Sequence, residues 1–159
     1  MRSKLSPVRL KSRIFRGAFR PDDIYKMLPE VDDAIIEAMD IETLAANPSW
    51  TWSHGYREPL VCAGFLPIIP GVVETWAVVS PKLRLMRCRV QLAYDLYDFH
   101  LEYCQRHDIR RVQCMVDNAF PPAKTFVEHL GYRYESAMLQ WGRNEDIRLR
   151  YVWFLKDHL

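Results

Sequence analysis

The stretch RRVQCMVDNAFPPAKTFVEHLGYRY, residues 110–134, carries the pattern that decides which fold the chain adopts. Its first part, Arg111–Asp117, has the length of a strand and places the β-branched Val112 and Val116 among other apolar residues. A short apolar run of this kind is typical of a buried strand. We therefore predict that Arg111–Asp117 forms a strand in the core of the protein.

A helix is predicted directly after this strand. The break that begins at Asn118 contains Pro121 and Pro122, and proline suits a first helical turn because its missing N–H would have no partner inside the helix. Apolar residues then recur every three or four positions as far as Leu130, and Gly131 stands where a helix end commonly needs a left-handed residue. The helix should therefore end at Leu130 and lay its apolar side on the strand. Four side chains are expected to be buried together: Phe126, Leu130, Val112 and Val116.

Length and composition indicate a single globular domain over residues 1–159. The chain is 49% hydrophobic and 13% aromatic, which is enough to close one substantial core. Its longest apolar stretch, roughly Leu60–Val73, contains Pro67, Pro70 and two glycines and falls short of the roughly 18 to 20 residues of a membrane helix. The four cysteines include no Cys-x-x-Cys pair, and scattered thiols fit a reducing compartment better than a disulfide framework. We expect a cytoplasmic protein without a membrane-spanning segment.

The net charge of +2 conceals a basic N-terminal arm. The first twenty residues contain Arg and Lys but no Asp or Glu, a composition also found in organelle transit peptides. Val8, Leu10 and Ile14 alternate with basic residues, which favours a strand with one face in water. Binding to nucleic acid would require more basic surface than this arm provides, because affinity follows the number of phosphates neutralised. We therefore expect a strand here and no nucleic-acid partner.

The rest of the chain predicts short helices and strands followed by one long helix. Helix ends are indicated by proline, glycine and acidic residues, and strands by β-branched and aromatic runs between turns. In chain order the predicted elements are a helix from Pro21 that ends at Pro29, a helix from Val31 that fades before Asn47-Pro48, strands Trp50–Ser53, Leu60–Ile69 and Val72–Ser80, a helix from Arg84 to His107, and a hairpin of Tyr134–Trp141 and Ile147–Leu155. The helical period predicts that the apolar face of the long helix consists of Met86, Val90, Ala93, Tyr97, Leu101 and Cys104.

This order of elements, together with Leu130-Gly131-Tyr132 after the last helix, resembles the GNAT superfamily of acyl-CoA-dependent N-acetyltransferases. The resemblance covers essentially the full chain and implies an α+β GNAT fold, with a central, mostly antiparallel mixed sheet of about seven strands flanked by helices. It also implies a function, the transfer of an acetyl group from acetyl-CoA to a primary amine of a protein or small molecule. In this superfamily the fourth strand and the long helix hold the cofactor, and these are Glu74–Ser80 and Arg84–His107 here.

The loop before the long helix departs from the pattern of the superfamily. Relatives use Arg-Gly-x-Gly-x-Gly/Ala, whose backbone N–H groups receive a pyrophosphate at a helix N-terminus, whereas Leu85, Arg87 and Arg89 stand at the glycine positions here. Side chains obstruct close approach of the backbone and disfavour positive φ. Arginine side chains can contact phosphates instead, and the alternative is a solvated basic helix start. The cofactor contacts that the resemblance implies are Val78, Val79, Arg84, Arg87, Arg89 and Asn118.

Glu74 is the candidate catalytic base. The resemblance places it near the position from which many relatives deprotonate the amine, directly or through water. The alternative is an ordinary carboxylate at a strand edge or turn. The leaving-group acid of relatives is a tyrosine, but its position is Val127 here, so the hydroxyl must come from elsewhere. The tyrosines considered for it are Tyr132, Tyr134 and Tyr97.

We expect no metal site. His100, Cys104 and His107 share one face of the long helix, but a helix face without a fourth ligand nearby seldom builds a closed zinc site. No nucleophile elbow and no glycine-rich phosphate loop of the nucleotide-binding kind is present in the sequence. Hydrolase and kinase functions therefore lack support.

The departures from the superfamily pattern leave a second function open. The loop without glycines and the missing tyrosine resemble divergent GNAT-like proteins of bacteriophages, some of which are virion components. The alternative to an acetyltransferase is therefore a non-catalytic GNAT-fold structural or assembly protein. An enzyme would take an amine substrate as its partner, whereas an assembly protein would bind other protein subunits and would be located in a virion.

Overall fold

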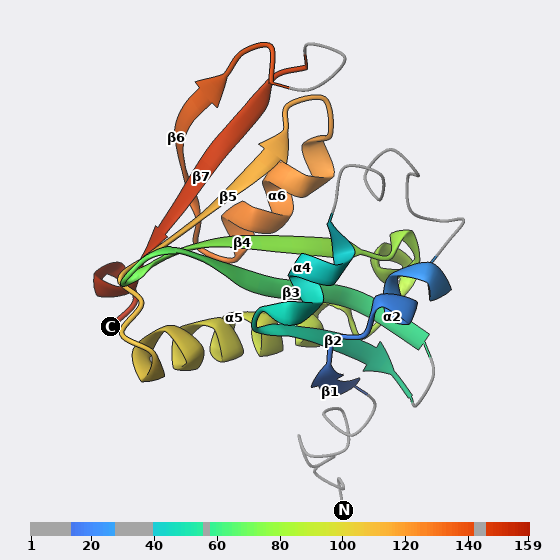
Figure 1. The fold of residues 1–159 in the computed structure, drawn as a ribbon. Helices are drawn as coiled ribbons and strands as arrows, with labels where there is room; N and C mark the ends of the chain where they lie inside the picture. The colour runs from blue at the N-terminus through green and yellow to red at the C-terminus, as the bar shows by residue number, and fades with distance from the viewer. Residues whose placement is uncertain (1–13, 28–39, 56–57, 142–145) are drawn as a thin grey trace, which may run out of the picture. The chain divides into compact units, whose positions relative to one another are not determined.

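The computed structural model describes residues 14–27, 40–55, 58–141 and 146–159. In these residues seven strands form one hydrogen-bonded sheet in the order β1-β2-β3-β4-β5-β7-β6 (Figure 1). β4 and β5 are parallel, and the other described pairs are antiparallel. The predicted α+β class with a mostly antiparallel, mixed sheet is confirmed.

The strands are β1 (Ile14–Ala18), β2 (Ser49–His54), β3 (Glu58–Ile69), β4 (Val72–Val79), β5 (Arg111–Asp117), β6 (Arg133–Met138) and β7 (Arg148–Phe154). The described helices are α2 (Pro21–Lys26), α4 (Ile41–Ala46), α5 (Arg89–Arg106) and α6 (Pro121–His129), with 3-10 turns η1 (Pro81–Leu85) and η2 (Leu155–Asp157). Most of the predicted N-terminal strand and the first part of the predicted helix from Val31 lie outside the described residues. The described end of that helix is α4, which stops before Asn47 as predicted.

Internal contacts divide the chain into two compact units, each made of two segments. Unit 1 comprises Met1–Phe65 and Ala77–Leu92, and unit 2 comprises Leu66–Trp76 and Ala93–Leu159. The chain passes from one unit to the other within β3, within β4 and within α5. A single domain over residues 1–159 stays a prediction.

Unit 1 contains a meander of antiparallel strands. β1 pairs with β2 from Ile14 opposite His54 to Ala18 opposite Trp50, and β2 pairs with β3. At the start of α2 the backbone N–H of Arg20 donates to the Asp23 carboxylate at 3.0 Å, which also accepts the Thr51 hydroxyl at 2.8 Å. This carboxylate therefore caps the helix and ties it to β2. The core residues with no exposed surface in this part of the chain include Ile24, Leu60, Val61 and Cys62.

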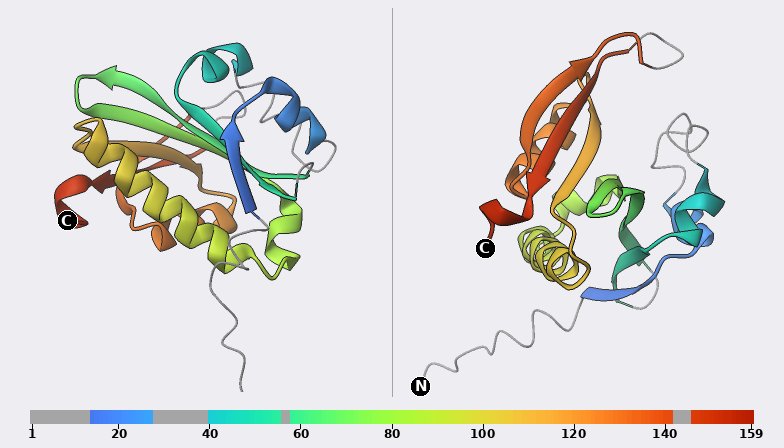
Figure 2. Two further views of the ribbon diagram at one scale, coloured as in Figure 1. Left: turned by 90° about the horizontal axis from the view of Figure 1, so that it is seen from below. Right: turned by 60° about the vertical axis from the view of Figure 1, so that its left-hand side comes forward.

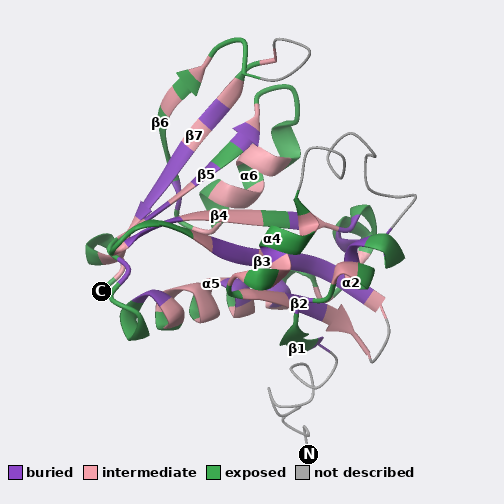
Figure 3. Ribbon diagram, viewed as in Figure 1, coloured by how far each residue is buried: buried purple, intermediate pink, exposed green. Residues whose placement is uncertain are grey.

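Unit 2 contains β5 between β4 and β7, and β6 beyond β7. β5 pairs with β7 along its whole length, from Arg111 opposite Phe154 to Asp117 opposite Arg148. Because side chains of a strand alternate between its faces, Val112, Cys114 and Val116 are buried on one face of β5. Figure 3 shows the burial of each strand by colour. The opposite face of β5 carries the polar and charged residues Arg111, Gln113 and Asp117.

The structure confirms the strand and the helix predicted in residues 110–134. β5 has the predicted bounds, α6 begins at Pro121, and Leu130 is its C-cap. Gly131 has a φ of +88°, which favours glycine, and a Cβ there would lie 2.6 Å from a ring carbon of His158.

The burial predicted for α6 is only partly correct. Val112 and Val116 are buried, but Phe126 and Leu130 are half-buried and no residue of α6 is fully buried. Figures 1 and 2 show α6 lying along β5, which it contacts. Because α6 has only nine residues and lies on one side of the sheet, the side chains of Phe126 and Leu130 stay partly accessible to solvent.

The long helix differs from the prediction in its start and in its buried face. The predicted segment from Arg84 begins as the 3-10 turn η1, and α5 starts only at Arg89. Val90, expected to be buried, is 57% exposed, whereas Leu92 and Leu96 are buried. The buried residues Leu92, Leu96 and Cys104 lie four or eight positions apart, and His100 falls in the same series. A histidine within that stripe makes its apolar pattern hard to recognise in the sequence.

We predict that Leu92→Ala lowers the free energy of unfolding by about 2 to 5 kcal/mol, because it leaves a cavity at a fully buried position. The matched change Val90→Ala, at an exposed position of the same helix, should cost less than about 0.5 kcal/mol. Urea unfolding followed by circular dichroism measures both. A larger cost for Val90→Ala than for Leu92→Ala would show that α5 buries the face expected from the sequence.

Candidate functional site

The candidate site lies on the polar face of unit 2, where β4 and β5 run in parallel. The register pairs Val73 with Val112 and Glu74 with Gln113. Both valines are buried, so the alternation of side chains places Glu74 and Gln113 next to each other on the opposite face. Both are half-buried. The parallel pairing covers only Val72–Glu74 of β4, so Glu74 lies at its end.

The environment of Glu74 favours its neutral form more than water does. Burial raises the pKa of the Glu74 carboxyl, and the positive charge of Arg150 on β7 acts in the opposite direction. No hydrogen bond joins this carboxyl to another residue that the structure describes. A half-buried carboxylate with a raised pKa is a stronger base than an exposed one, and it remains available to accept a proton.

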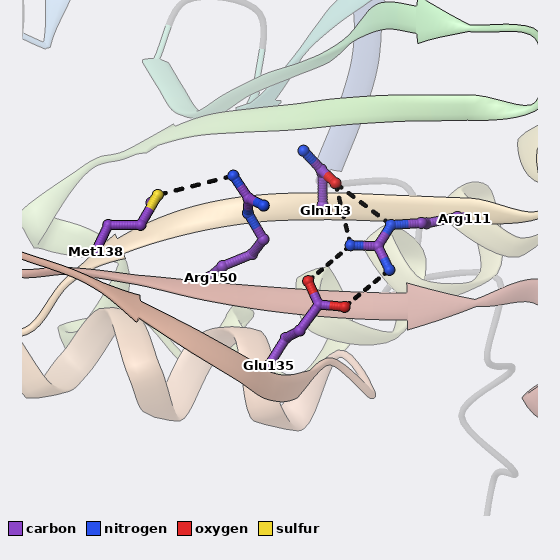
Figure 4. A network of polar contacts seen from close by, with 5 residues as sticks. All are labelled: Arg111, Gln113, Glu135, Met138 and Arg150. Carbon is purple, nitrogen blue, oxygen red and sulfur yellow. Dashed lines mark hydrogen bonds and ion pairs between the residues drawn. The ribbon is translucent and has the colours of Figure 1, made fainter.

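A network of hydrogen bonds satisfies the charges beside Gln113 (Figure 4). Two nitrogens of Arg111 donate to the two carboxylate oxygens of Glu135, at 2.9 and 2.7 Å. The Gln113 carbonyl oxygen accepts from Arg111 Nε at 3.3 Å and from Nη2 at 3.2 Å. The bidentate pair lowers the pKa of Glu135 and raises that of Arg111. Arg111 and Glu135 therefore neutralise each other.

A strand irregularity brings Glu135 into this network. The register of β6 against β7 shifts between Tyr134 and Ser136, so Glu135 is the extra residue of a bulge. Extra residues of bulges leave the regular alternation of side chains. Glu135 thereby reaches Arg111, which is two strands away in the sheet.

Arg150 has no comparable partner. Its Nη2 donates to the Met138 sulfur at 3.7 Å, a weak acceptor. Its Nε is buried without a hydrogen-bond partner among the described residues. Farther along β7, Arg148 is paired with Asp146 at 2.8 Å and with Asp117 at 3.5 Å. Within the described part of this face, Glu74 and Arg150 are therefore the charged residues that lack a hydrogen-bonded ion pair.

The five residues of unit 1 that were predicted to bind a cofactor lie on β4, in η1, between η1 and α5, and at the first residue of α5. Val78 is buried and Val79 half-buried, and the side chains of Arg84, Arg87 and Arg89 are exposed. Arg89 Nη1 donates to the Arg84 backbone oxygen at 2.7 Å. The Arg89 side chain is therefore bonded within the loop itself. Arg84 and Arg87 are the arginines that remain for a ligand.

The backbone of the loop before α5 is ordinary. The non-glycine residues with positive φ in the described chain are Asp108 and Gln140, so Leu85, Arg87 and Arg89 do not adopt the conformation that glycine would favour. A pyrophosphate would therefore be held by arginine side chains and by the α5 N-terminus, without a glycine cradle.

Asn118 belongs to unit 2 and is exposed. Its side-chain oxygen accepts from Lys124 Nζ at 2.9 Å, and its backbone N–H donates to the Ile147 oxygen at 3.1 Å. These bonds fix the turn between β5 and α6. A contact of Asn118 with a cofactor stays a prediction.

Two of the three tyrosines considered for the acid contact histidines. The Tyr132 hydroxyl lies 3.3 Å from His100 Nε2, and the Tyr97 hydroxyl lies 3.0 Å from His158 Nδ1. Burial raises the pKa of Tyr132 and lowers that of His100 to about 3. A tyrosine with a raised pKa is a poor proton donor, so Tyr132 is not favoured as the acid. Tyr134 is exposed, and the acid remains unassigned.

The three residues considered as metal ligands, His100, Cys104 and His107, pack against other side chains or are buried. His100 contacts the Trp153 ring at 4.5 Å, and the His107 ring lies 4.2 Å from that of Tyr103. Burial raises the pKa of Cys104 to about 12, which disfavours the thiolate that metals bind. The described residues contain no group of metal-ligating side chains.

Three residues of the polar face were not predicted from the sequence, namely Gln113, Glu135 and Arg150. A signal existed for Gln113, which is polar within an otherwise apolar strand, and for Arg150, which alternates with apolar residues in RLRYVWF. No local signal indicated Glu135, because its position depends on the bulge.

Comparison with known proteins establishes the fold. No protein-family model matches the chain, and no curated protein matches its sequence. The structure is similar to that of a GNAT-family acetyltransferase from Bacillus anthracis, with a TM-score of 0.69 and 12% identity over 91% of this chain and 96% of that one. The chain has the GNAT fold.

Two further structures with this fold are an N-acetyltransferase from Staphylococcus aureus Mu50 and a dodecameric spermidine N-acetyltransferase from Vibrio cholerae. The first has a TM-score of 0.65 and 13% identity, over 89% of this chain and 98% of that chain. The second has a TM-score of 0.66 and 12% identity, over 93% and 97%. The predicted GNAT fold is thus confirmed, and at this level of identity the likeness concerns the fold alone. Among the described helices, none has the length and apolar character needed to span a membrane.

Proposed function

We propose that the protein is an N-acetyltransferase that acetylates a primary amine with acetyl-CoA and uses Glu74 as the base. The observation that carries this proposal is the position of Glu74, a half-buried carboxyl with a raised pKa at the end of the parallel β4–β5 pairing. The GNAT fold supports the same reaction class, since the compared structures with this fold are described as acetyltransferases. A bacteriophage origin has no support beyond the sequence resemblance.

The reaction needs a neutral amine, because an ammonium group has no lone pair with which to attack. Glu74 accepts the proton of the ammonium and then returns it to solvent. Burial raises the pKa of Glu74 and so strengthens it as a base, while the positive charge of Arg150 acts in the opposite direction. Acetyl-CoA supplies the thioester, whose carbon–sulfur bond breaks as the amide bond forms and whose sulfur leaves with a second proton from the amine nitrogen.

The residues at the start of α5 fit the phosphates of this cofactor. Arg84 and Arg87 are exposed and have no ion-pair partner among the described residues, and guanidinium groups match phosphate oxygens. The eighteen residues of α5 present their N-terminal end at the same place, and a helix N-terminus favours anions. We assign the pyrophosphate to Arg84 and Arg87, and the acyl-pantetheine chain to β4 at Val78 and Val79.

Replacing both arginines tests the cofactor assignment. Acetyl-CoA at a hundred times its dissociation constant should stabilise the parent by about 2.7 kcal/mol, and the Arg84→Ala/Arg87→Ala variant should show a smaller shift at the same concentration. Thermal unfolding with and without acetyl-CoA measures this. The control is Arg106→Ala/Arg133→Ala, which removes two other exposed arginines. Equal shifts in parent and test variant would exclude the arginine contacts, and no shift in the parent would favour a non-catalytic assembly protein.

The base is tested by Glu74→Gln. This variant should fold and bind acetyl-CoA but acetylate an accepted amine about 10² to 10⁴ times more slowly, which is the usual contribution of a positioned base. The deficit should shrink at pH values above the pKa of the amine, where the acceptor is already neutral. Thiol release followed over a range of pH gives the rates, with the exposed Glu102→Gln as control. Equal rates of Glu74→Gln and parent at neutral pH would exclude Glu74 as the base.

A further inference from the structure

The polar face of unit 2 carries one negative group, Glu74, and one positive group, Arg150, that form no hydrogen-bonded ion pair with the described residues. Arg111 is held by Glu135, and Arg148 is held by Asp117 and Asp146. The Glu74 carboxylate and the Arg150 guanidinium take part in none of these ion pairs. The register places Glu74 opposite Gln113 and Arg150 opposite Met115, two residues farther along β5. Both groups therefore lie on the same face of the sheet, on the two strands that flank β5, where one small molecule can reach both.

The guanidinium of Arg150 has a hydrogen-bond donor that the described residues do not satisfy. A buried N–H without a hydrogen-bond partner costs roughly 1 to 3 kcal/mol, and Arg150 Nε is in this state among the described residues. The Nη2 of the same guanidinium donates to the Met138 thioether. A buried polar group in this condition needs an explanation, and a functional role such as binding a ligand is one. An anionic ligand is the kind that a guanidinium selects.

A second donor lies on the same face. Both hydrogen bonds of the Gln113 carbonyl oxygen go to Arg111, so the amide nitrogen of Gln113 points away from Arg111 (Figure 4). No partner for this nitrogen is present among the described residues. Gln113 lies between Glu74 on β4 and β7, which carries Arg150. A carboxylate held by Arg150 would therefore also find an amide N–H₂ on the strand that separates the two charges.

On the basis of the proposed function, we propose that the acceptor is an amino acid or another small molecule with a carboxylate next to its amine. Its amine faces Glu74, and its carboxylate binds Arg150, with Gln113 as the neighbouring donor. One free carboxylate and one free guanidinium match the two charges of a zwitterion. A diamine or polyamine would bring a second ammonium group against Arg150, where like charges repel. The face therefore selects zwitterions and disfavours polycations.

The test measures binding and turnover on the full chain. The probes are the common amino acids, the carboxamide of each, and 1,4-diaminobutane, each with acetyl-CoA present. Calorimetry gives binding with a non-reactive thioether analogue of acetyl-CoA, and thiol release gives turnover with acetyl-CoA itself. We expect at least one amino acid to bind about 10 to 100 times more tightly than its carboxamide, the usual effect of a hydrogen bond to a charged group.

Variants connect this preference to Arg150. Arg150→Gln should abolish the preference for the carboxylate over the carboxamide. Arg150→Lys should retain a reduced preference, which keeps the test valid if the glutamine variant unfolds. The matched control is Arg106→Gln, which removes one positive charge from the exposed side of α5 and should leave the preference intact. Unfolding curves of the variants establish that they are folded.

The outcomes separate this inference from the proposed function. Equal binding of amino acid and carboxamide, tighter binding of 1,4-diaminobutane, a preference that survives in Arg150→Gln, or no binding by any probe would overturn the carboxylate site. Thiol release with diamines or carboxamides and no carboxylate preference would support the acetyltransferase and overturn the site. Carboxylate-dependent binding without thiol release would support the site and count against the transferase.

Discussion

The parallel register of β4 against β5 is the constraint on which the candidate site depends. It buries Val73 against the same face as Val112 and so forces Glu74 onto the opposite face, beside Gln113. A shift of one residue would bury the carboxylate and expose the valine. Because burying both valines stabilises the sheet by a few kcal/mol, the hydrophobic core itself fixes the direction of Glu74. The position of Glu74, the proposed base, is therefore a consequence of packing.

Neutralisation of neighbouring charges gives this position its chemical character. The Arg111–Glu135 pair, held further by Gln113, takes two charges out of the surroundings of Glu74 (Figure 4). The charge that remains to act on Glu74 is that of Arg150. Burial favours the protonated form of the Glu74 carboxyl, and the positive charge of Arg150 favours the carboxylate. A direct ion pair with Arg150 would instead hold Glu74 as an inert carboxylate, so the absence of such a bond among the described residues is what the proposed role as a base requires.

The features that could be predicted from the sequence are those determined by residues close together in the chain. Strand β5, the start of α6 at Pro121 and the left-handed Gly131 all follow from local chemistry, and the structure confirms them. Glu74 was singled out because the resemblance to the GNAT superfamily places it near the position of the base in many relatives. The buried face of α5 was mistaken, since His100 lies in line with Leu92 and Leu96 and packs against Trp153. The partners of Glu74 escaped prediction because Arg150 and Glu135 come from strands placed by long-range pairing, and Glu135 by a bulge.

The central claim is that Glu74 is a base tuned by burial and by one arginine. Carbon-13 NMR of the glutamate side-chain carboxyls, assigned to Glu74 by its loss in Glu74→Gln, measures its pKa directly. The account predicts a pKa above the ordinary value of 4.5 in the parent. It predicts a further rise in Arg150→Gln, because loss of the positive charge removes stabilisation of the carboxylate. A parent pKa at or below the ordinary value, or no change on replacing Arg150, would contradict the account.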